Sequence, residues 1–226
     1  MNIFPIGTIS AASSSGSLNS VSYNMFEPNA RASSSVKHNI LVTPYQNQIK
    51  LTRKKAEPFI IIQYDYNNIF SREYKQIEHF IYNLGDALTS FYVVNWAEGI
   101  TPSSVVDASG DWTAAITNTR LFSTITNQKA NRAFLWDGLN WKEGAIASLS
   151  ANTSITVDVD TSNFGALTLA NANANSIVYP LYECYCTPDS LADFNTTVYL
   201  PESINLADDG GYMRSGSISF VSKYKV

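Results

Sequence analysis

The chain has 226 residues, a formal net charge of −4 and only 15% charged residues, compared with roughly 25% in an ordinary soluble domain. Its hydrophobic content of 45% is enough to bury a core in one large domain or two small ones. No run reaches the ~20 apolar residues of a membrane-spanning helix, and a signal-peptide pattern is absent. Low charge with many aromatic residues is typical of packed assemblies, because interface cores are depleted in charge. A secreted or extracellular β protein is the alternative interpretation, because such proteins share this composition.

Charge is unevenly distributed along the sequence. Twelve of the fifteen Lys and Arg residues lie between Arg31 and Lys142, whereas Glu143 to Met213 contains no Lys, Arg or His. In a homo-oligomer this division favours head-to-tail contacts between copies, and simple solvation of both regions is the alternative. The run 53–55 (Arg-Lys-Lys) is predicted to be a solvated loop or a contact to an acidic neighbour. It is too short for a nucleic-acid site in an acidic protein.

Residues 1–35 are predicted to form an N-terminal arm. Serine clusters at 13–15 and 33–35 oppose a compact fold, while short apolar groups that include Phe4 and Ile6 allow strands. We expect the arm to become ordered against a partner surface, such as a neighbouring subunit, and terminal disorder is the alternative.

The next predicted elements are strands. Short strands are expected at Ile40–Val42 and Gln48–Leu51, around a turn at Pro44. The stretch Phe59–Tyr66 is β-branched and aromatic, which predicts a strand covered on both faces at its start. Asn67-Asn68 is expected to end it.

One short amphipathic helix is predicted at about residues 72–84. Ser71 is expected to cap it, Glu73 lies favourably in the first turn, and Gly85 suits the left-handed position just past its end. His79 falls on the polar face and is read as a surface histidine. The apolar stripe, which is expected to pack on a sheet, consists of Tyr74, Ile77, Phe80, Ile81 and Leu84.

The remainder reads as strands and turns. A hairpin is predicted within Ala133–Trp141, turning at Asp137-Gly138. In the last strand Ile218, Phe220 and Tyr224 are expected to point inward. The other expected strands are Ser90–Trp96, which includes Phe91 and ends at Trp96, then Ile155–Val159, Val178–Cys186 and Gly216–Val226, with an irregular edge at Tyr199–Leu206.

These elements predict a mainly β (α+β) fold, an antiparallel β-sandwich or roll with one helix packed on the sheet. The core domain is expected to comprise residues 36–101 and 177–226. Residues 102–176 are expected to be an inserted or appended β region.

The sequence contains no recognisable catalytic, cofactor-binding or metal-binding constellation. Cys184 and Cys186 would lie about 6.6 Å apart on one face of a strand, where a disulfide is strained, so two reduced, part-buried thiols are expected. Asp158 and Asp160 are too few for a calcium site. The four tryptophans are expected in the core or an interface, with a carbohydrate-binding surface as the alternative.

The stretch Phe59–Trp96 resembles tail proteins of tailed bacteriophages, in particular the distal-tail and minor-tail group. The resemblance lies in a strand, a helix with a central aromatic (Phe80), a turn at Gly85 and an aromatic strand ending at Trp96. Three C-terminal pieces, 178–181, 199–200 and 216–220, resemble the closing segment of the same group, and Arg31 to Asn39 is weakly similar. Residues 102–176 lie outside the resemblance.

The resemblance implies a virion structural protein, made in the host cytoplasm, that forms a ring, often six-fold, in the phage tail. Its expected partners are other copies of itself and the tube, hub, baseplate or fibre subunits, with no catalytic residue, no cofactor, no required nucleic-acid contact and no membrane. Two alternatives stay open: a ring protein of the head–tail connector, and a carbohydrate- or receptor-binding β module.

Overall fold

The computed structural model describes residues 2–9, 15–18, 21–38, 40–44, 50–54, 58–84, 89–108, 111–125, 129–158, 176–186, 191, 193–199 and 212–224. This part of the chain contains α1 (Ser71–Asn83), the short 3-10 helix η1 (Trp96–Glu98) and strands β1 (Asn2–Ile3), β2 (Gly7–Ile9), β3 (Ser15–Leu18), β4 (Val21–Asn24), β5 (Arg31–Lys37), β6 (Ile40–Pro44), β7 (Lys50–Lys54), β8 (Phe59–Phe70), β9 (Phe91–Val94), β10 (Ser104–Ala108), β11 (Asp111–Ala115), β12 (Arg132–Trp136), β13 (Trp141–Ser150), β14 (Ser154–Asp158), β15 (Ile177–Cys186), β16 (Asn195–Tyr199) and β17 (Tyr212–Ser222). The prediction of a mainly antiparallel β fold with one helix packed on it is confirmed.

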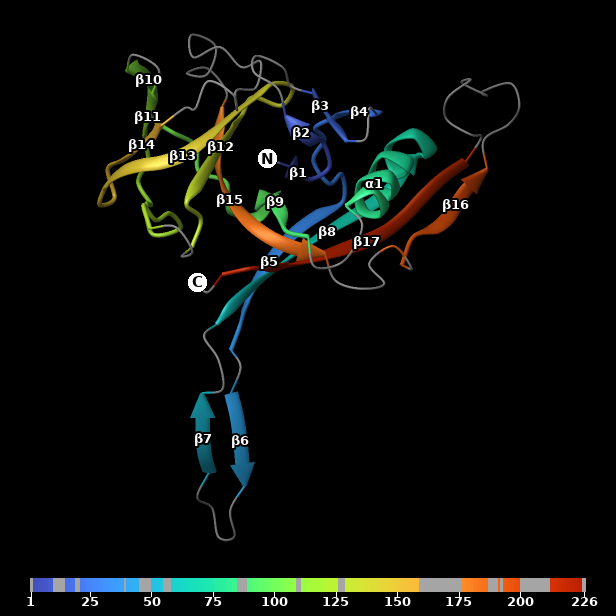
Figure 1. Cartoon of the computed structure of the whole chain (residues 1–226), viewed down its shortest axis with the longest axis horizontal. Helices are drawn as coiled ribbons and strands as arrows, with labels where there is room; N and C mark the ends of the chain where they lie inside the picture. The colour runs from blue at the N-terminus through green and yellow to red at the C-terminus, as the bar shows by residue number, and fades with distance from the viewer. Residues whose placement is uncertain are drawn as a thin grey trace.

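Strand β15 joins the two parts of the main sheet (Figure 1). Its first half pairs with β12, which leads to β13, β14, β11 and β10, and its middle pairs with β9. Its last residues pair with β17, which also pairs with β8 and β16, while β5 pairs with β8. The sheet therefore branches at β15 and folds over a shared core.

The main core lies between these parts of the sheet and α1. Tyr64 on β8 and Phe220 on β17 are almost fully buried, with their ring centroids 5.2 Å apart. The hydroxyl of Tyr64 donates a hydrogen bond to the Val94 carbonyl of β9, so one side chain links two parts of the sheet. Alternating burial of Ile60, Ile62 and Tyr64 along β8 follows from the period-2 geometry of a strand.

The junction between β8 and α1 differs from the prediction in two ways. Strand β8 continues past Asn67 to Phe70, because Asn68 takes a left-handed backbone conformation (φ 52°) beside a register shift against β17. Ser71 is the first helical residue and not the cap, since its hydroxyl donates to the Tyr212 carbonyl at 3.0 Å. The Glu73 carboxylate instead accepts the Phe70 N–H at 3.0 Å, which satisfies one orphan donor of the first turn. Gly85 lies outside the described residues.

The structure places the residues of the predicted apolar stripe in the interior. Ile81 on α1 and Leu84, which follows the last helical residue Asn83, are partly buried against the main core. The helix, predicted at about residues 72–84, runs from Ser71 to Asn83. Trp96 and Tyr224 are half-buried, and Tyr224 lies beyond the end of β17. Of the residues that the sequence predicts for the core or an interface, on the helix and on the strands at 90–96 and 216–226, the buried ones are Tyr74, Ile77, Phe80, Phe91, Ile218 and Phe220.

The N-terminal segment packs on its own chain, whereas the sequence led us to expect a partner surface. Ile3 pairs in parallel with Tyr92 of β9, and β5 pairs along its whole length with β8. Phe4 is 1% exposed and contacts the rings of Phe80 and Phe220, with centroids 5.1 and 4.8 Å away. The first residues therefore complete the core of this chain.

The region 102–176 extends the same sheet through the pairing of β12 with β15. The predicted hairpin is present: Trp136 pairs with Trp141, and Gly138 has a positive φ of 97° in the turn between them. The strand predicted at Ser90–Trp96 is shorter, since β9 ends at Val94 and Trp96 begins η1. No described helix is both long and apolar enough to cross a membrane.

Candidate interaction surface

Strands β5 and β8 form an edge of the main sheet, and beyond Ile61, where β17 ceases to pair with β8, they continue outward as a two-stranded ribbon. Strands β5 and β8 pair from Arg31↔Asp65 to Lys37↔Phe59. The inner part of β8 is anchored to the core, whereas Val36 near the outer end of β5 is 48% exposed. Ser33 and Ser34 of β5 are half-exposed and Ser35 is exposed, and their short side chains add little apolar area to this edge.

The root of this ribbon is held by contacts on two sides. The Ile60 N–H donates to the Ser222 hydroxyl of β17 at 2.9 Å. On the other side β5 packs beside η1. Burial raises the pKa of the Glu98 carboxyl on η1, and a smaller opposing effect comes from its hydrogen bond with Ser34. The Asn95 side-chain amide also donates to Glu98, at 2.8 Å. The ribbon thus starts from a fixed base.

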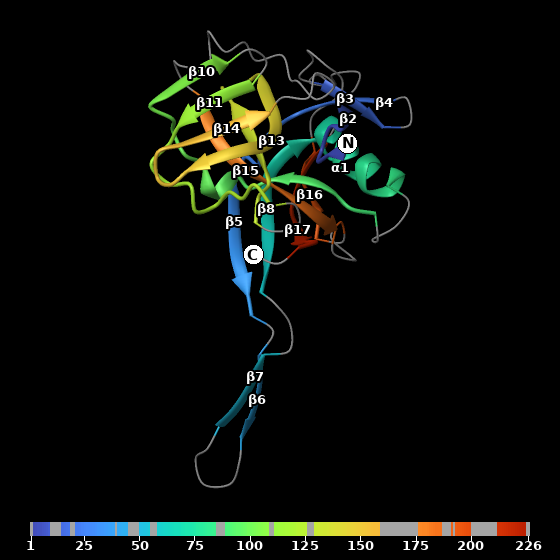
Figure 2. The same ribbon diagram turned by 60° about the vertical axis from the view of Figure 1, so that its left-hand side comes forward.

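Beyond the ribbon, β6 and β7 form a separate two-stranded sheet with register Ile40↔Lys54 to Pro44↔Lys50. Figures 1 and 2 show this hairpin far from the rest of the molecule in two views. An isolated two-stranded hairpin is marginally stable at best in water, because it has no third strand or helix to cover a face. Among the described residues no third strand pairs with the hairpin β6–β7.

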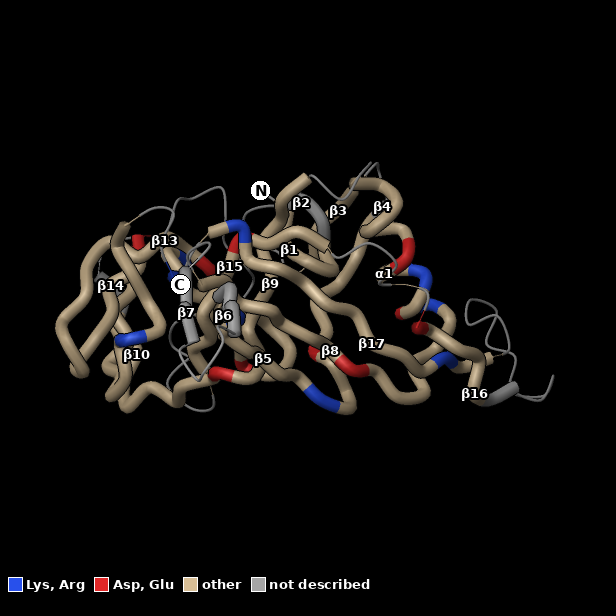
Figure 3. Tube along the Cα trace, turned by 90° about the horizontal axis from the view of Figure 1, so that it is seen from below, with Lys and Arg blue, Asp and Glu red and all other residues tan. Residues whose placement is uncertain are grey.

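The hairpin segment is strongly basic by sequence. Residues 37–55 contain five Lys and Arg residues, one His and no Asp or Glu. The described body has few charges along its strands (Figure 3). Arg53 and Lys54 belong to β7, which corrects the prediction of a loop at 53–55. Residues 50–54 (Lys-Leu-Thr-Arg-Lys) have only one apolar residue, so no alternating pattern in the sequence indicated this longer strand.

The described part of the chain brings together no cluster of candidate metal ligands. Within the described ranges no group of three or more His, Cys, Asp or Glu residues is placed to hold a metal ion, and Asp160 lies outside those ranges. His38 and His79 are exposed. Cys184 and Cys186 are free thiols. Burial raises the pKa of the Cys184 thiol well above its usual value, which makes it a poor nucleophile.

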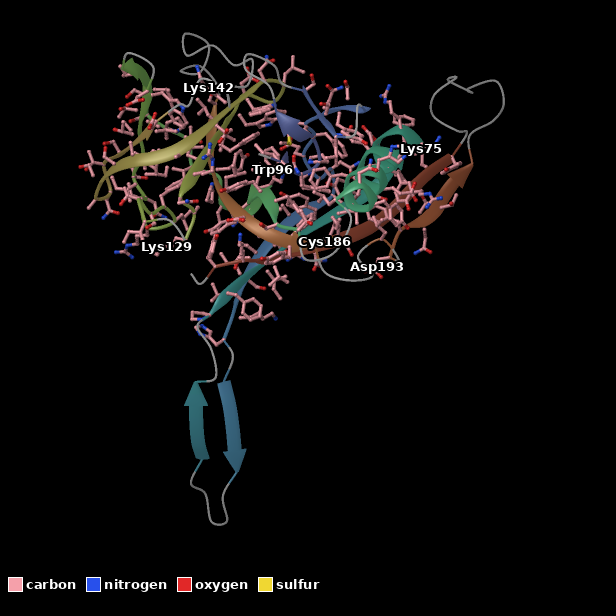
Figure 4. All side chains as sticks on the ribbon, viewed as in Figure 1. Lys75, Trp96, Lys129, Lys142, Cys186 and Asp193 are labelled. Carbon is pink, nitrogen blue, oxygen red and sulfur yellow. The ribbon has the colours of Figure 1, made fainter. Side chains whose placement is uncertain are left out.

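The tryptophans form core and not a sugar-binding platform. Trp112 and Trp141 are fully buried, and Trp136 is 5% exposed. Trp96 lies within the body (Figure 4), with its ring 4.9 Å from that of Tyr179 and 5.7 Å from that of Trp136. A carbohydrate surface needs such rings to face solvent, whereas the Trp96 ring packs edge-to-face against Tyr179 and Trp136.

Comparison of the chain with protein-family models and with curated proteins gives no match to either. The projecting hairpin β6–β7 is the part of the described structure that forms a sheet of its own, apart from the main sheet.

Proposed function

We propose that this chain is a structural subunit of the virion of a tailed bacteriophage, a ring-forming tail adaptor that links the tail tube to the hub, baseplate or fibres. Two observations support the proposal. The sequence resembles the distal-tail and minor-tail group at Phe59–Trp96, and a β-rich body with one helix packed on it agrees with that resemblance.

The observation with most weight is the hairpin β6–β7. It makes no sheet with the body, and its two strands leave both outer edges without a strand partner among the described residues. Open edges and marginal stability favour assembly, because a neighbour supplies the missing hydrogen bonds and the missing apolar cover. A subunit that acts by itself has no use for such an extension.

The mechanism is mechanical and interfacial. Each subunit presents a hairpin to a neighbour, and repetition of this contact by rotation closes a ring. The proposed work is to hold tail components together, without catalysis or a cofactor, in the tail of the virion. A ring at the head–tail joint is the nearest alternative and uses the same contact.

Removal of the hairpin tests the proposal. Lys37 and Phe59 are register partners, so a two-residue Asn-Gly turn in place of residues 38–58 closes the ribbon without disturbing the body. We expect the wild-type chain to form a closed multiple of 24.9 kDa by light scattering and the shortened chain to be a monomer with an unchanged melting temperature. The same number of subunits in the two proteins would contradict the proposal.

A further inference from the structure

On the outward face of β10, β11, β14 and β13, two rows of residues carry no charged side chain. The registers of these strands align two rows across it, Val106–Thr113–Thr156–Ser148 and Ser104–Ala115–Ser154–Ser150. All eight residues are exposed or half-exposed, while the alternate residues of the two central strands, such as Trp112 and Ile155, are buried on the other side. Roughly a quarter to a third of surface positions are charged in soluble domains. We call these eight residues the outer face.

The outer face is also ordered and partly apolar. The hydroxyls of Thr113 and Thr156 are hydrogen-bonded to each other at 3.1 Å across neighbouring strands. Val106 is 57% exposed on the strand at the end of the row. A face with fixed side chains and little charge loses little solvation when a second sheet packs on it.

Two carboxylates lie at one end of the outer face. The pairing of Trp112 with Val157 places Asp111 and Asp158 next to each other on neighbouring strands. Like charges in directly opposed positions are destabilising. Neither carboxylate forms an ion pair with any described residue, and no Lys or Arg occurs between Glu143 and Met213. Arg132, which the strand registers place two strands from Asp158 in the same row, is instead paired with Glu143, so no described cation pairs with these two carboxylates.

The hairpin β6–β7 has the complementary charge and a matching size. Its strand β7 contains Lys50, Arg53 and Lys54, and there is no acidic residue between 37 and 55. A five-residue strand is about 17 Å long, and four strands spaced ~4.8 Å apart span about 14 Å. The hairpin lies away from the outer face of its own chain in both ribbon views, so it reaches such a face only on another molecule (Figures 1 and 2).

We propose that the hairpin β6–β7 of one subunit docks on the outer face of a second copy of this chain, with its Lys and Arg residues beside Asp111 and Asp158. This inference rests on the proposed self-assembly and identifies the two surfaces that meet. The contact is heterologous, with a donor hairpin and an acceptor face on every subunit, and such contacts close into rings when the rotation allows it.

Charge reversal on each surface tests the contact. The acceptor variant carries Asp111→Lys and Asp158→Lys, and the donor variant carries Lys50→Glu, Arg53→Glu and Lys54→Glu. We expect each variant alone to weaken assembly by on the order of 10-fold or more, because like charges then face each other. In an equimolar mixture every hairpin finds a face of opposite charge, so assembly is expected to return with the two variants alternating.

A matched control separates this contact from net charge. Glu27→Lys with Asp193→Lys changes the net charge as much as the acceptor variant does, at two exposed positions outside the outer face. We expect this control to assemble like the wild type in light scattering. If the acceptor variant also assembles like the wild type, the docking site is wrong while the proposed function stands. If the wild type is a monomer at every concentration, self-assembly itself is contradicted.

Discussion

Truncation of Phe4 to alanine tests whether the N-terminal segment belongs to the core of its own chain. Phe4 is 1% exposed and lies among four aromatic rings. Its centroid is 4.8 Å from Phe220, 5.1 Å from Phe80, 6.0 Å from Tyr64 and 6.3 Å from Phe91. These rings belong to α1, β8, β9 and β17, so Phe4 contacts residues that are far apart in the sequence.

The expected loss is large. A buried Phe→Ala change costs about 3–5 kcal/mol, from lost transfer free energy and the cavity that remains. Aromatic pairs add about 0.5–1.5 kcal/mol each beyond the buried area, which places Phe4→Ala in the upper half of that range, at about 4–5 kcal/mol. In a chain of this size each 1 kcal/mol shifts the melting temperature by about 2–4 °C, so we expect a fall of roughly 8–20 °C.

Urea unfolding followed by tryptophan fluorescence gives the free energy of unfolding of each variant. Leu139→Ala is the control, because Leu139 is 75% exposed in the turn between β12 and β13 and its loss should cost no more than about 0.5 kcal/mol. If Phe4→Ala costs less than about 1 kcal/mol, Phe4 does not fill this core, since a buried Phe→Ala change costs several times more. The arm that packs on a neighbour would then be the better description.

Two further predictions concern buried charge. Glu143 is fully buried and accepts hydrogen bonds from Nε and Nη2 of Arg132 at 2.9 and 2.7 Å, so Glu143→Leu should cost about 3–5 kcal/mol in urea unfolding. Adding Arg132→Met should recover much of that loss, and purely additive losses would contradict the pairing. Burial raises the pKa of the Glu183 carboxyl, but hydrogen bonds from Lys223 and Ser90 outweigh this and leave that pKa below its usual value. The ionised carboxylate therefore stabilises the fold fully above the unfolded pKa of about 4.3, and the stabilisation is lost as the pH falls through the lower folded pKa. The free energy of unfolding of Glu183→Gln should not show this decrease as the pH falls. If the free energies of unfolding of the wild type and the variant depend on pH in the same way, the carboxylate contributes nothing.

Features with a local cause could be predicted from the sequence. The helix follows from apolar spacing at Tyr74, Ile77 and Phe80, and the β12–β13 hairpin follows from Asp137-Gly138 between apolar runs. The Asp137 carboxylate accepts the N–H groups of Leu139 and Asn140 at 2.8 and 2.6 Å, which is a local turn interaction. Such signals depend on residues close together in the chain.

Features that depend on distant partners could not be predicted. Phe4 is followed by a polar, serine-rich stretch, and only the residues around it in the fold make it core. Ser71 is a favoured capping residue, but its hydroxyl donates a hydrogen bond to the carbonyl of Tyr212, 141 positions away in the sequence. The hairpin β6–β7 was visible as short strands, whereas its separation from the body follows from the register of β5 with β8. The outer face needs four strands in register before its lack of charge becomes apparent.

Negative-stain imaging of the purified wild-type chain tests the central claim most directly. The account predicts closed rings whose subunit number can be counted and which disappear when residues 38–58 are replaced by Asn-Gly. Single particles of 24.9 kDa at every concentration, or rings that persist without the hairpin, would contradict it.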